Sequence, residues 1–184
     1  MSNAGQAQSI FLLTGAVQGG KTTFLGSLIE RLTDERTKVG GFLCPGTFDS
    51  GIRSAFSLKN ILTGVELPMG SARESLDWFK YRRFWFNPEA FKEGEEWIRE
   101  SLRQEAQIII VDEVGPMELE GAGWSEILDD LVKMPLPLQL WSVRENILQE
   151  VMQRWDVPPE HLIRIDTMNV DQAATLISSK LKNN

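Results

Sequence analysis

The sequence predicts an α/β fold of three layers, with a mostly parallel central sheet and helices on both faces. Short apolar segments alternate along the chain with segments whose apolar residues recur at helical spacing. The short segments are apolar throughout, as in Ile-Ile-Ile-Val at 108–111, which is typical of parallel strands buried on both faces. A length of 184 residues with 42% hydrophobic residues suffices for one core. Residues 1–184 are therefore expected to form a single domain.

In the first half of the chain, apolar runs bounded by turn residues flank one amphipathic segment. Residues 9–14 (SIFLLT) stop at Gly15 and predict the first strand. After Lys21, apolar residues recur at helical spacing with charged residues opposite, which predicts a helix. Residues 38–44 predict a second strand, because a Pro-Gly pair follows them. Residues 47–73 are rich in Gly and Ser and predict a short hairpin followed by a mobile insertion. The segment 47–83 as a whole is interpreted as an insertion or lid.

In the second half, apolar runs and helical patterns alternate regularly. Residues 83–87 predict a third strand, and Pro88 then opens a helix, since proline suits the first helical position. Residues 107–112 predict an apolar strand that ends in an acidic residue. The remaining elements continue the alternation, with helices expected at 124–132, 146–155 and 170–181 and strands at 138–142 and 162–166.

The position of a ligand site follows from this topology. Parallel sheets bind their ligands beyond the carboxyl ends of the strands. The loops after Thr14, Val111 and Leu140 are therefore expected to converge on one site.

The composition of the chain limits which binding partners and which cellular compartment are expected. A formal net charge of −7 disfavours nucleic acid as the main partner, since backbone phosphates are bound by clustered Lys and Arg. The only cysteine, Cys44, excludes an intramolecular disulfide and favours a reducing, cytoplasmic setting. No long apolar run predicts a membrane span or a signal segment. Residues 1–8 carry no fold signal and are expected to be disordered or derived from a tag.

One segment matches the Walker A pattern GxxxxGK[S/T] without a mismatch, between a predicted strand and a predicted helix. Its glycines let backbone N–H groups surround phosphate oxygens, and the helix N-terminus adds positive potential. Lys21 is expected to bridge the β- and γ-phosphates, Thr22 to bind Mg²⁺ and Thr23 to reach the α-phosphate. A glycine-rich turn with an incidental lysine is the alternative, which the strand and helix context disfavours. The expected nucleotide-binding residues are Gly15, Ala16, Val17, Gln18, Gly19, Gly20, Lys21, Thr22 and Thr23.

Two carboxylates follow the apolar strand at 107–112 and resemble a Walker B end. Asp112 is expected to hold magnesium through water, while Glu113 points toward the γ-phosphate. A carboxylate one water away from phosphorus can orient and partly deprotonate the attacking water, so Glu113 is a candidate general base. The alternative is that Glu113 is a solvated residue at a strand end or a cap for the next segment.

With these motifs in place, the sequence resembles the small P-loop nucleoside triphosphatases, which include the cancer-related nucleoside-triphosphatase of vertebrates and its thermophile homologues. The resemblance implies a RecA-like core and slow hydrolysis of several nucleoside triphosphates, ATP and GTP among them. It also implies that Lys21, Thr22, Asp112 and Glu113 act as described above, and that Glu118 supports the site. The residues that carry it are TGAVQGGKTT at 14–23, GGF at 40–42, GIRSAF at 51–56 and VDEVGPMEL at 111–119.

Several basic and polar residues have two interpretations. Arg144 follows the strand at 138–142 and could neutralise charge on the γ-phosphate, or could be a surface residue. Ser142 could contact the γ-phosphate, or cap the strand end. Arg53 and Arg73 could reach the phosphates from a lid, but each is interpreted as a solvated surface residue. The basic and aromatic cluster at 80–86 could stack on a base, but core aromatics beside solvated charges are favoured.

The leading hypothesis is a magnesium-dependent nucleoside triphosphatase, in which Glu113 activates water for attack on the γ-phosphate. One alternative is a small-molecule kinase, whose acceptor would lie beneath residues 47–83. Another is a nucleotide-dependent switch that binds a protein partner, although no sequence feature names such a partner.

Overall fold

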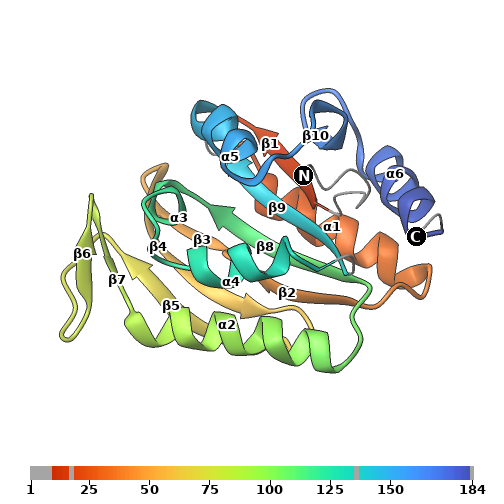
Figure 1. Ribbon diagram of the computed structural model, residues 1–184. Helices are drawn as coiled ribbons and strands as arrows, with labels where there is room; N and C mark the ends of the chain where they lie inside the picture. Colours follow the sequence, from red (N-terminus) through yellow and green to blue (C-terminus); the bar gives the residue numbers. More distant parts are fainter. Residues whose placement is uncertain (1–9, 17–18, 135–136, 183–184) are drawn as a thin grey trace, which may run out of the picture.

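The computed structural model describes residues 10–16, 19–134 and 137–182, whose strands all join one sheet (Figure 1). The strand order is β10-β1-β9-β8-β2-β4-β5-β7-β6, and β3 pairs with β4. The expectations for residues 1–8, and for Val17 and Gln18, lie outside the described residues. The remainder of the chain forms the predicted α/β fold, with helices on both faces of the sheet.

The sheet has a parallel half and an antiparallel half. In the parallel half, β10, β1, β9, β8 and β2 lie side by side and run in the same direction. Their bounds are β10 (Leu162–Arg164), β1 (Ile10–Gly15), β9 (Leu138–Arg144), β8 (Ile108–Val114) and β2 (Val39–Leu43). Because these strands share a direction, the carboxyl ends of β1, β8 and β9 meet at one edge, and the predicted convergence of their loops is confirmed.

The antiparallel half extends the sheet beyond β2. Its strands are β3 (Gly46–Asp49), β4 (Ile52–Asn60), β5 (Glu66–Ser71), β6 (Phe79–Tyr81) and β7 (Phe84–Phe86). The predicted hairpin is present as β3 and β4. The expectation of a mobile insertion after the hairpin is wrong for 66–71, which form β5 and pair with β4 in a ladder. The strand predicted at 83–87 exists as β7, but it is antiparallel and lies near the sheet edge.

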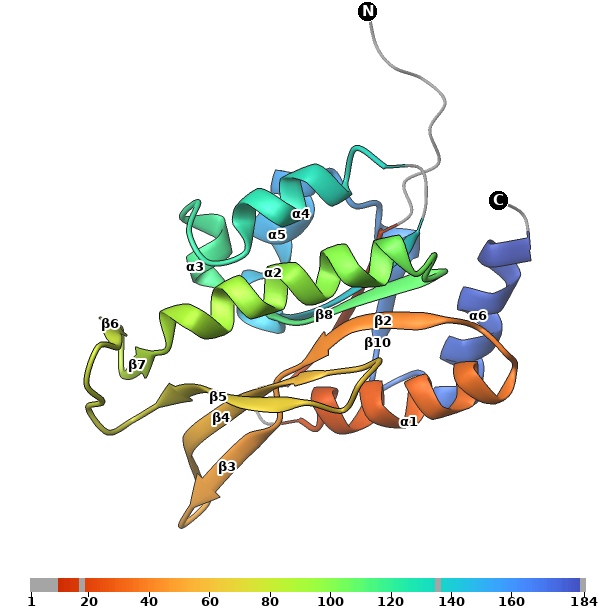
Figure 2. The ribbon, with the colours of Figure 1, turned by 90° about the horizontal axis from the view of Figure 1, so that it is seen from below.

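Helices cover the two faces unequally, as Figure 2 shows from below. One face carries α2 (Pro88–Arg103), α3 (Pro116–Leu119), α4 (Ser125–Leu131) and α5 (Leu148–Trp155); the other carries α1 (Lys21–Asp34) and α6 (Val170–Lys182). Short 3-10 turns precede α5 and β10, at Glu145–Ile147 and Pro159–His161. The helix bounds agree with the sequence patterns except for α3, which no pattern predicts, and the 3-10 start of the segment at 146–155.

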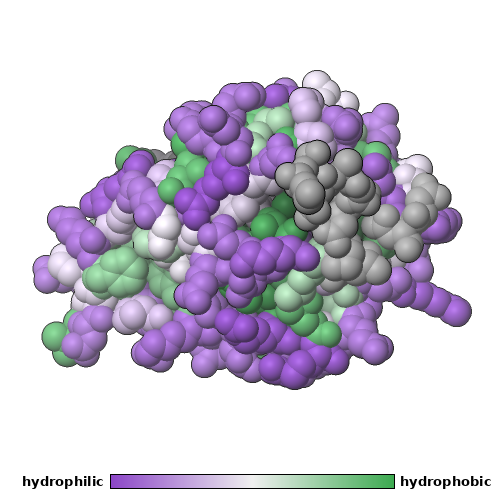
Figure 3. Space-filling model, in the orientation of Figure 1, coloured by the Kyte–Doolittle hydropathy of each residue, from purple (hydrophilic) through white to green (hydrophobic). Residues whose placement is uncertain are grey.

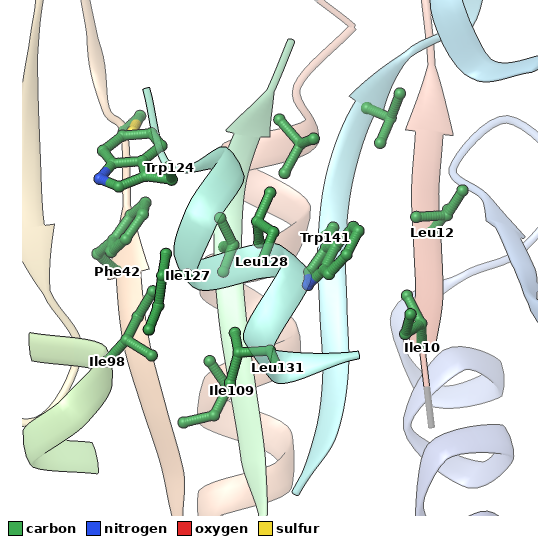
Figure 4. Packing of buried hydrophobic residues seen from close by; sticks show 14 of the residues in the cluster. Ile10, Leu12, Phe42, Ile98, Ile109, Trp124, Ile127, Leu128, Leu131 and Trp141 are labelled. Carbon is green, nitrogen blue, oxygen red and sulfur yellow. The ribbon is translucent and has the colours of Figure 1, made fainter. Parts of the chain in front are cut away.

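Two cores result from this layering. Beneath α1 and α6, leucines spaced along α1 pack on the inward side chains of β1 and β8. On the opposite face, α2, α4 and α5 cover the sheet, and Figure 4 shows Trp124 and Phe42 lying ring against ring. The centroids of those two rings are 4.5 Å apart. None of the described helices is both long enough and apolar enough to cross a bilayer.

Candidate active site

The glycine-rich loop joins β1 to α1 at the carboxyl edge of the parallel strands. Gly20 has φ 83°, a left-handed conformation that glycine adopts without strain, and it directs the chain into α1. The Lys21 ammonium donates to the carbonyl oxygens of Gly15, at 3.3 Å, and Ala16, at 3.2 Å. Burial lowers the pKa of Lys21, while the nearby Glu113 charge opposes that shift. The Lys21 side chain therefore packs against the glycine-rich loop, beside the place where nucleotide phosphates are predicted to bind.

Asp112 lies at the centre of a hydrogen-bond network and is fully buried. Its Oδ2 accepts from the Thr22 hydroxyl at 2.8 Å and from the Cys44 backbone N–H at 2.9 Å. Its Oδ1 accepts from the Ser142 hydroxyl. Burial raises the pKa of Asp112, as does the charge of Glu113, and the three hydrogen bonds counteract part of that rise. The network fixes Thr22 and Asp112 as neighbours.

These two oxygen donors fit a magnesium ion. Mg²⁺ prefers oxygen ligands and is usually bound through one or two carboxylates together with water and substrate phosphates. The Thr22 hydroxyl and the Asp112 carboxylate are already within 2.8 Å of each other, beside the loop. Among the residues described, no group of three or more His, Cys, Asp or Glu side chains could hold a metal by itself.

Glu113 occupies a strained backbone position. Its φ is 70°, in the left-handed region that non-glycine residues rarely adopt, and pairing of β8 with β9 shifts register between Val111 and Val114. The Glu113 N–H donates to the Ser142 hydroxyl oxygen at 2.8 Å. Local strain of this kind is often retained at functional sites. At this bulge the Glu113 carboxylate contacts Arg53 and Arg144, which are not among the hydrogen-bond donors to Asp112.

Two arginines hold the Glu113 carboxylate. Arg53 donates to Oε1 at 2.7 Å, and Arg144 donates to Oε2 at 3.3 Å. Burial raises the pKa of Glu113, but the charges and hydrogen bonds of Arg53 and Arg144 outweigh it and leave the pKa lowered. Glu113 is consequently ionised at neutral pH, which a general base requires.

Arg53 is the residue that the sequence places wrongly. Its side chain is only 13% exposed, and it bridges Glu113 and the carbonyl oxygen of Cys44, to which it donates at 2.8 Å. Because it lies on β4, the antiparallel half of the sheet brings it over the edge of the parallel half. The signal that could have found it is the GIRSAF segment. Arg73 is exposed, as predicted, and Arg144 lies in the site.

Glu118 stabilises the turn that follows β8. It is 3% exposed, and its carboxylate accepts from the N–H groups of Gly115, at 2.8 Å, and Trp124, at 3.2 Å. Burial raises the pKa of Glu118 to about 7. Ser142 likewise contacts Asp112 and Glu113 rather than serving only as a strand cap. Glu118 therefore supports the shape of the site by holding backbone on the far side of Glu113.

Lys21, Thr22, Arg53, Glu113 and Arg144 line a cavity of about 390 Å³. Its floor is the glycine-rich loop and the start of α1, and its walls include Pro45, Phe48 and Phe84. Lys21, Arg53 and Arg144 place positive charge around it, and Glu113 supplies the negative charge. Within the described residues, the cavity thus combines the start of α1, the Thr22 hydroxyl and an ionised carboxylate, and Asp112 lies buried directly behind Thr22.

Comparison with known proteins agrees with this geometry. The sequence model of the NTPase family matches residues 10–177. The chain belongs to this family. Membership of this family supports the predicted enzyme class, a nucleoside-triphosphatase.

Curated members of the NTPase family include proteins named nucleoside-triphosphatase THEP1. The one from Korarchaeum cryptofilum is 33% identical over 124 residues, covering 66% of this chain and 62% of its own length. The one from Methanocaldococcus jannaschii is 33% identical over 127 residues, covering 68% of this chain and 73% of its own. The match to the first relative therefore spans less than two thirds of that protein.

Solved structures show the same fold. THEP1 from the hyperthermophile Aquifex aeolicus has a TM-score of 0.69 at 19% identity and covers 94% of this chain and 98% of its own. A human cancer-related nucleoside triphosphatase has the same score and identity and covers 97% of this chain and 99% of its own. The predicted three-layer P-loop fold is confirmed.

Proposed function

We propose that this chain hydrolyses nucleoside triphosphates such as ATP and GTP to the diphosphate and phosphate, with magnesium and with Glu113 as the group that activates water. The observation that carries the proposal is the ionised Glu113 carboxylate at the wall of the cavity, held by Arg53 and Arg144. A carboxylate in this position can accept a proton from a water that attacks the γ-phosphorus.

The loop would bind the triphosphate through its backbone N–H groups and the N-terminus of α1. Residues 15–23 form this binding segment, and Lys21 would leave the carbonyl oxygens of Gly15 and Ala16 to bridge the β- and γ-phosphates. Thr23, in the first turn of α1, would reach the α-phosphate. A lysine that exchanges weak carbonyl contacts for phosphate oxygens gains strong, charge-assisted hydrogen bonds.

Thr22 and Asp112 would hold magnesium, Thr22 directly and Asp112 through water. The cation would neutralise charge on the β- and γ-phosphate oxygens. The Thr22 hydroxyl, which donates to Asp112 in this structure, would turn its oxygen lone pair toward the cation. Asp112 keeps its remaining hydrogen bonds to Cys44 and Ser142, so its position does not depend on the Thr22 contact.

Arg144 would neutralise charge that develops on the γ-phosphate during transfer. Its side chain is 44% exposed and shares the Glu113 carboxylate with Arg53, so it can turn toward a phosphate without leaving the site. An arginine in this role accelerates phosphoryl transfer by about 10³–10⁵-fold. We therefore assign Glu113, Lys21 and Arg144 as the catalytic residues.

The decisive experiment measures phosphate release from ATP and GTP, with and without magnesium, for the unaltered protein, Lys21→Ala and Glu113→Gln. We expect release to require magnesium and Lys21. Glu113→Gln should bind nucleotide with little change and lose turnover by at least about 100-fold, because the amide cannot accept the proton. Turnover by Glu113→Gln at the unaltered rate would remove Glu113 from its role as base.

The organisation of the whole chain is also a proposal. We infer that residues 1–184 are one P-loop domain, in which residues 47–83 form a cover over the site, because strand β4 carries Arg53 to Glu113. We further infer a cytoplasmic setting, on the basis of the single cysteine. With a net charge of −7, we expect no role for nucleic acid, and no feature identifies a protein partner.

A further inference from the structure

A second cavity, of about 300 Å³, lies on the other side of Glu113 from the glycine-rich loop. Aromatic and sulfur-containing side chains form most of its lining, among them Phe56, Met69, Phe91, Met117 and Trp124. Small-molecule sites in proteins are typically of this kind, mostly apolar and with a few polar groups, and have volumes from about 300 Å³ upward. The cavity therefore has the size and lining of a site for one small organic molecule.

The two cavities share a wall. Arg53, Arg83, Phe84, Glu113 and Arg144 line both of them. The second cavity contains one further carboxylate, Glu118, whose oxygens accept from backbone N–H groups. Glu113 is thus the carboxylate that faces both the nucleotide side and the apolar side. A molecule in the second cavity would meet the γ-phosphate at Glu113.

The lining also indicates what kind of molecule fits. Ring centroids are 5.0 Å apart for Phe91 and Trp124 and 5.3 Å apart for Phe56 and Phe84, so the walls already present ring faces and edges. A bound ring that stacks on these rings, or meets them edge to face, is stabilised beyond the burial of its area. In Figure 3, apolar surface is visible at the end of the molecule where β6 and β7 lie and also near the middle of this mostly hydrophilic face. A single planar ring suits this environment.

Arg83 adds a charge at the shared wall. Its guanidinium lies 4.5 Å from the centroid of the Phe84 ring, and it donates to the Arg53 carbonyl oxygen at 3.4 Å. Within the described part of the chain it forms no ion pair with a carboxylate, in contrast to Arg53 and Arg144. The Arg83 charge can therefore interact with the oxygens of a γ-phosphoryl group that passes from the first cavity to the second.

We propose that the second cavity binds a small aromatic alcohol and that the protein transfers the γ-phosphoryl group to it; this inference rests on the proposed nucleotide site. The alcohol oxygen forms a bond to the γ-phosphorus, and the bond between that phosphorus and the β–γ bridging oxygen breaks. The alcohol proton goes to Glu113, and the nucleoside diphosphate leaves. With the cavity empty, water takes the place of the alcohol, and the outcome is hydrolysis.

The test uses ATP labelled in the γ-phosphate together with benzyl alcohol, 2-phenylethanol, pyridine-3-methanol or adenosine. The methyl ethers of the first three, which present the same ring but no transferable proton, are the matched ligands. We expect labelled phosphate ester from at least one alcohol, with saturation at millimolar concentration, and none from the ethers. Glu113→Gln should abolish ester formation.

Variants of residues in the wall of the second cavity test whether the alcohol binds there. Phe91→Ala, which removes one ring, should raise the alcohol concentration at half-saturation by at least tenfold. Leu102→Ala, on the same helix and outside the cavity, is the control and should leave it unchanged. Phe91→Leu keeps the apolar volume without the ring and gives the same test if Phe91→Ala fails to fold.

The outcomes separate the two proposals. Phosphate release from ATP without ester from any of the four alcohols would overturn the acceptor site and leave the hydrolase intact. Alcohols that only slow phosphate release would show occupancy without transfer and would also overturn it. Failure of both release and transfer would remove the proposed function, and the acceptor site with it.

Discussion

At the scale of single residues, one carboxylate is shared by two guanidinium groups. Arg53 binds Glu113 and the Cys44 carbonyl oxygen with different nitrogens of one planar fork, whereas Arg144 makes a longer contact and is more exposed. With these two contacts, Arg53 fixes the position of Glu113 relative to Cys44, the residue that follows β2. Arg144 has the freedom to follow a phosphate. The two arginines are therefore expected to contribute differently to turnover.

Arg53→Ala should lower kcat by at least about 100-fold with a smaller effect on KM, because it removes a charge fixed beside the reacting group. It should also move the acidic limb of the pH–rate profile to higher pH. The Arg53 charge lowers the pKa of Glu113, and the base form exists only above that pKa, so its loss raises the pH that activity needs. A full pH–rate profile measures both effects.

Arg73→Ala is the matched control, because Arg73 is exposed and belongs to the same segment. It should leave kcat and the pH profile unchanged. An unshifted acidic limb in Arg53→Ala would mean that Glu113 does not control the rate.

At the scale of elements, the sequence predicts the parallel half of the fold well and the antiparallel half poorly. Strands such as 108–111 are buried on both faces and carry a continuous apolar signal, whereas β4 and β5 alternate irregularly and contain a register shift. Their pairing is a long-range property that no local pattern contains. Local patterning could not assign Arg53 for the same reason, since its contact with Glu113 depends on how β4 pairs with β2. Only the resemblance of the GIRSAF segment to the family could have indicated it.

The site divides in the same way. Lys21, Thr22, Asp112 and Glu113 come from two local motifs, and the structure brings them together as expected; their chemical roles remain predictions. The contacts of Ser142 and Cys44 with Asp112 join β9, β8 and the residue after β2, so spacing within one segment does not reveal them.

Within β2, Gly41 is required by backbone conformation and by packing. Its φ is 94°, and a Cβ there would overlap the carbonyl oxygen of Ile110 on β8. Gly41→Ala should therefore lower the free energy of unfolding by at least about 2 kcal/mol. Gly26→Ala, in α1 with open space around it, should instead raise it by about 0.5–1 kcal/mol. Denaturant unfolding of both variants measures the contrast, and equal effects would contradict the packing of β2 on β8.

The turn after β8 should make stability depend on pH. Burial raises the Glu118 pKa from 4.5 to about 7, so between these pH values the folded state retains a proton that the unfolded state has lost. The contribution of Glu118 to the free energy of unfolding is complete below pH 4.5 and is lost as the pH rises to about 7. The free energy of unfolding changes by about 3 kcal/mol over this range.

Unfolding free energies of the unaltered protein and Glu118→Gln, measured from pH 5 to pH 8, test this dependence. The decline of the unfolding free energy with rising pH should be smaller in Glu118→Gln, which has no proton to lose. It should be unaltered in Glu120→Gln, whose side chain is exposed. A decline of the same size in all three proteins would show that Glu118 does not titrate in this range.

At the scale of the whole molecule, an acidic protein carries a locally basic site. The net charge is −7, yet Lys21, Arg53, Arg83 and Arg144 gather around one cavity. Mutual repulsion of these cations is only partly offset by Glu113. A polyanion that binds there should thus stabilise the fold by removing repulsion as well as by mass action.

A non-hydrolysable ATP analogue with magnesium, at about 100 times its Kd, should add about 2.7 kcal/mol to the free energy of unfolding. For a protein of this size the midpoint of thermal unfolding should rise by about 5–10 °C. Removal of magnesium with EDTA should abolish most of the shift, and Lys21→Ala should show little shift in either condition. A shift of the same size without magnesium would contradict the proposed role of Thr22 and Asp112.

The position of Cys44 has a practical consequence. Its thiol is fully buried, its backbone N–H holds Asp112, and its carbonyl oxygen receives Arg53. A thiol reagent can reach it only when this junction of strands separates. Because the chain has no other cysteine, the rate at which a thiol reagent alkylates the native protein measures the rate of local opening at the proposed catalytic centre. The measurement needs no introduced label.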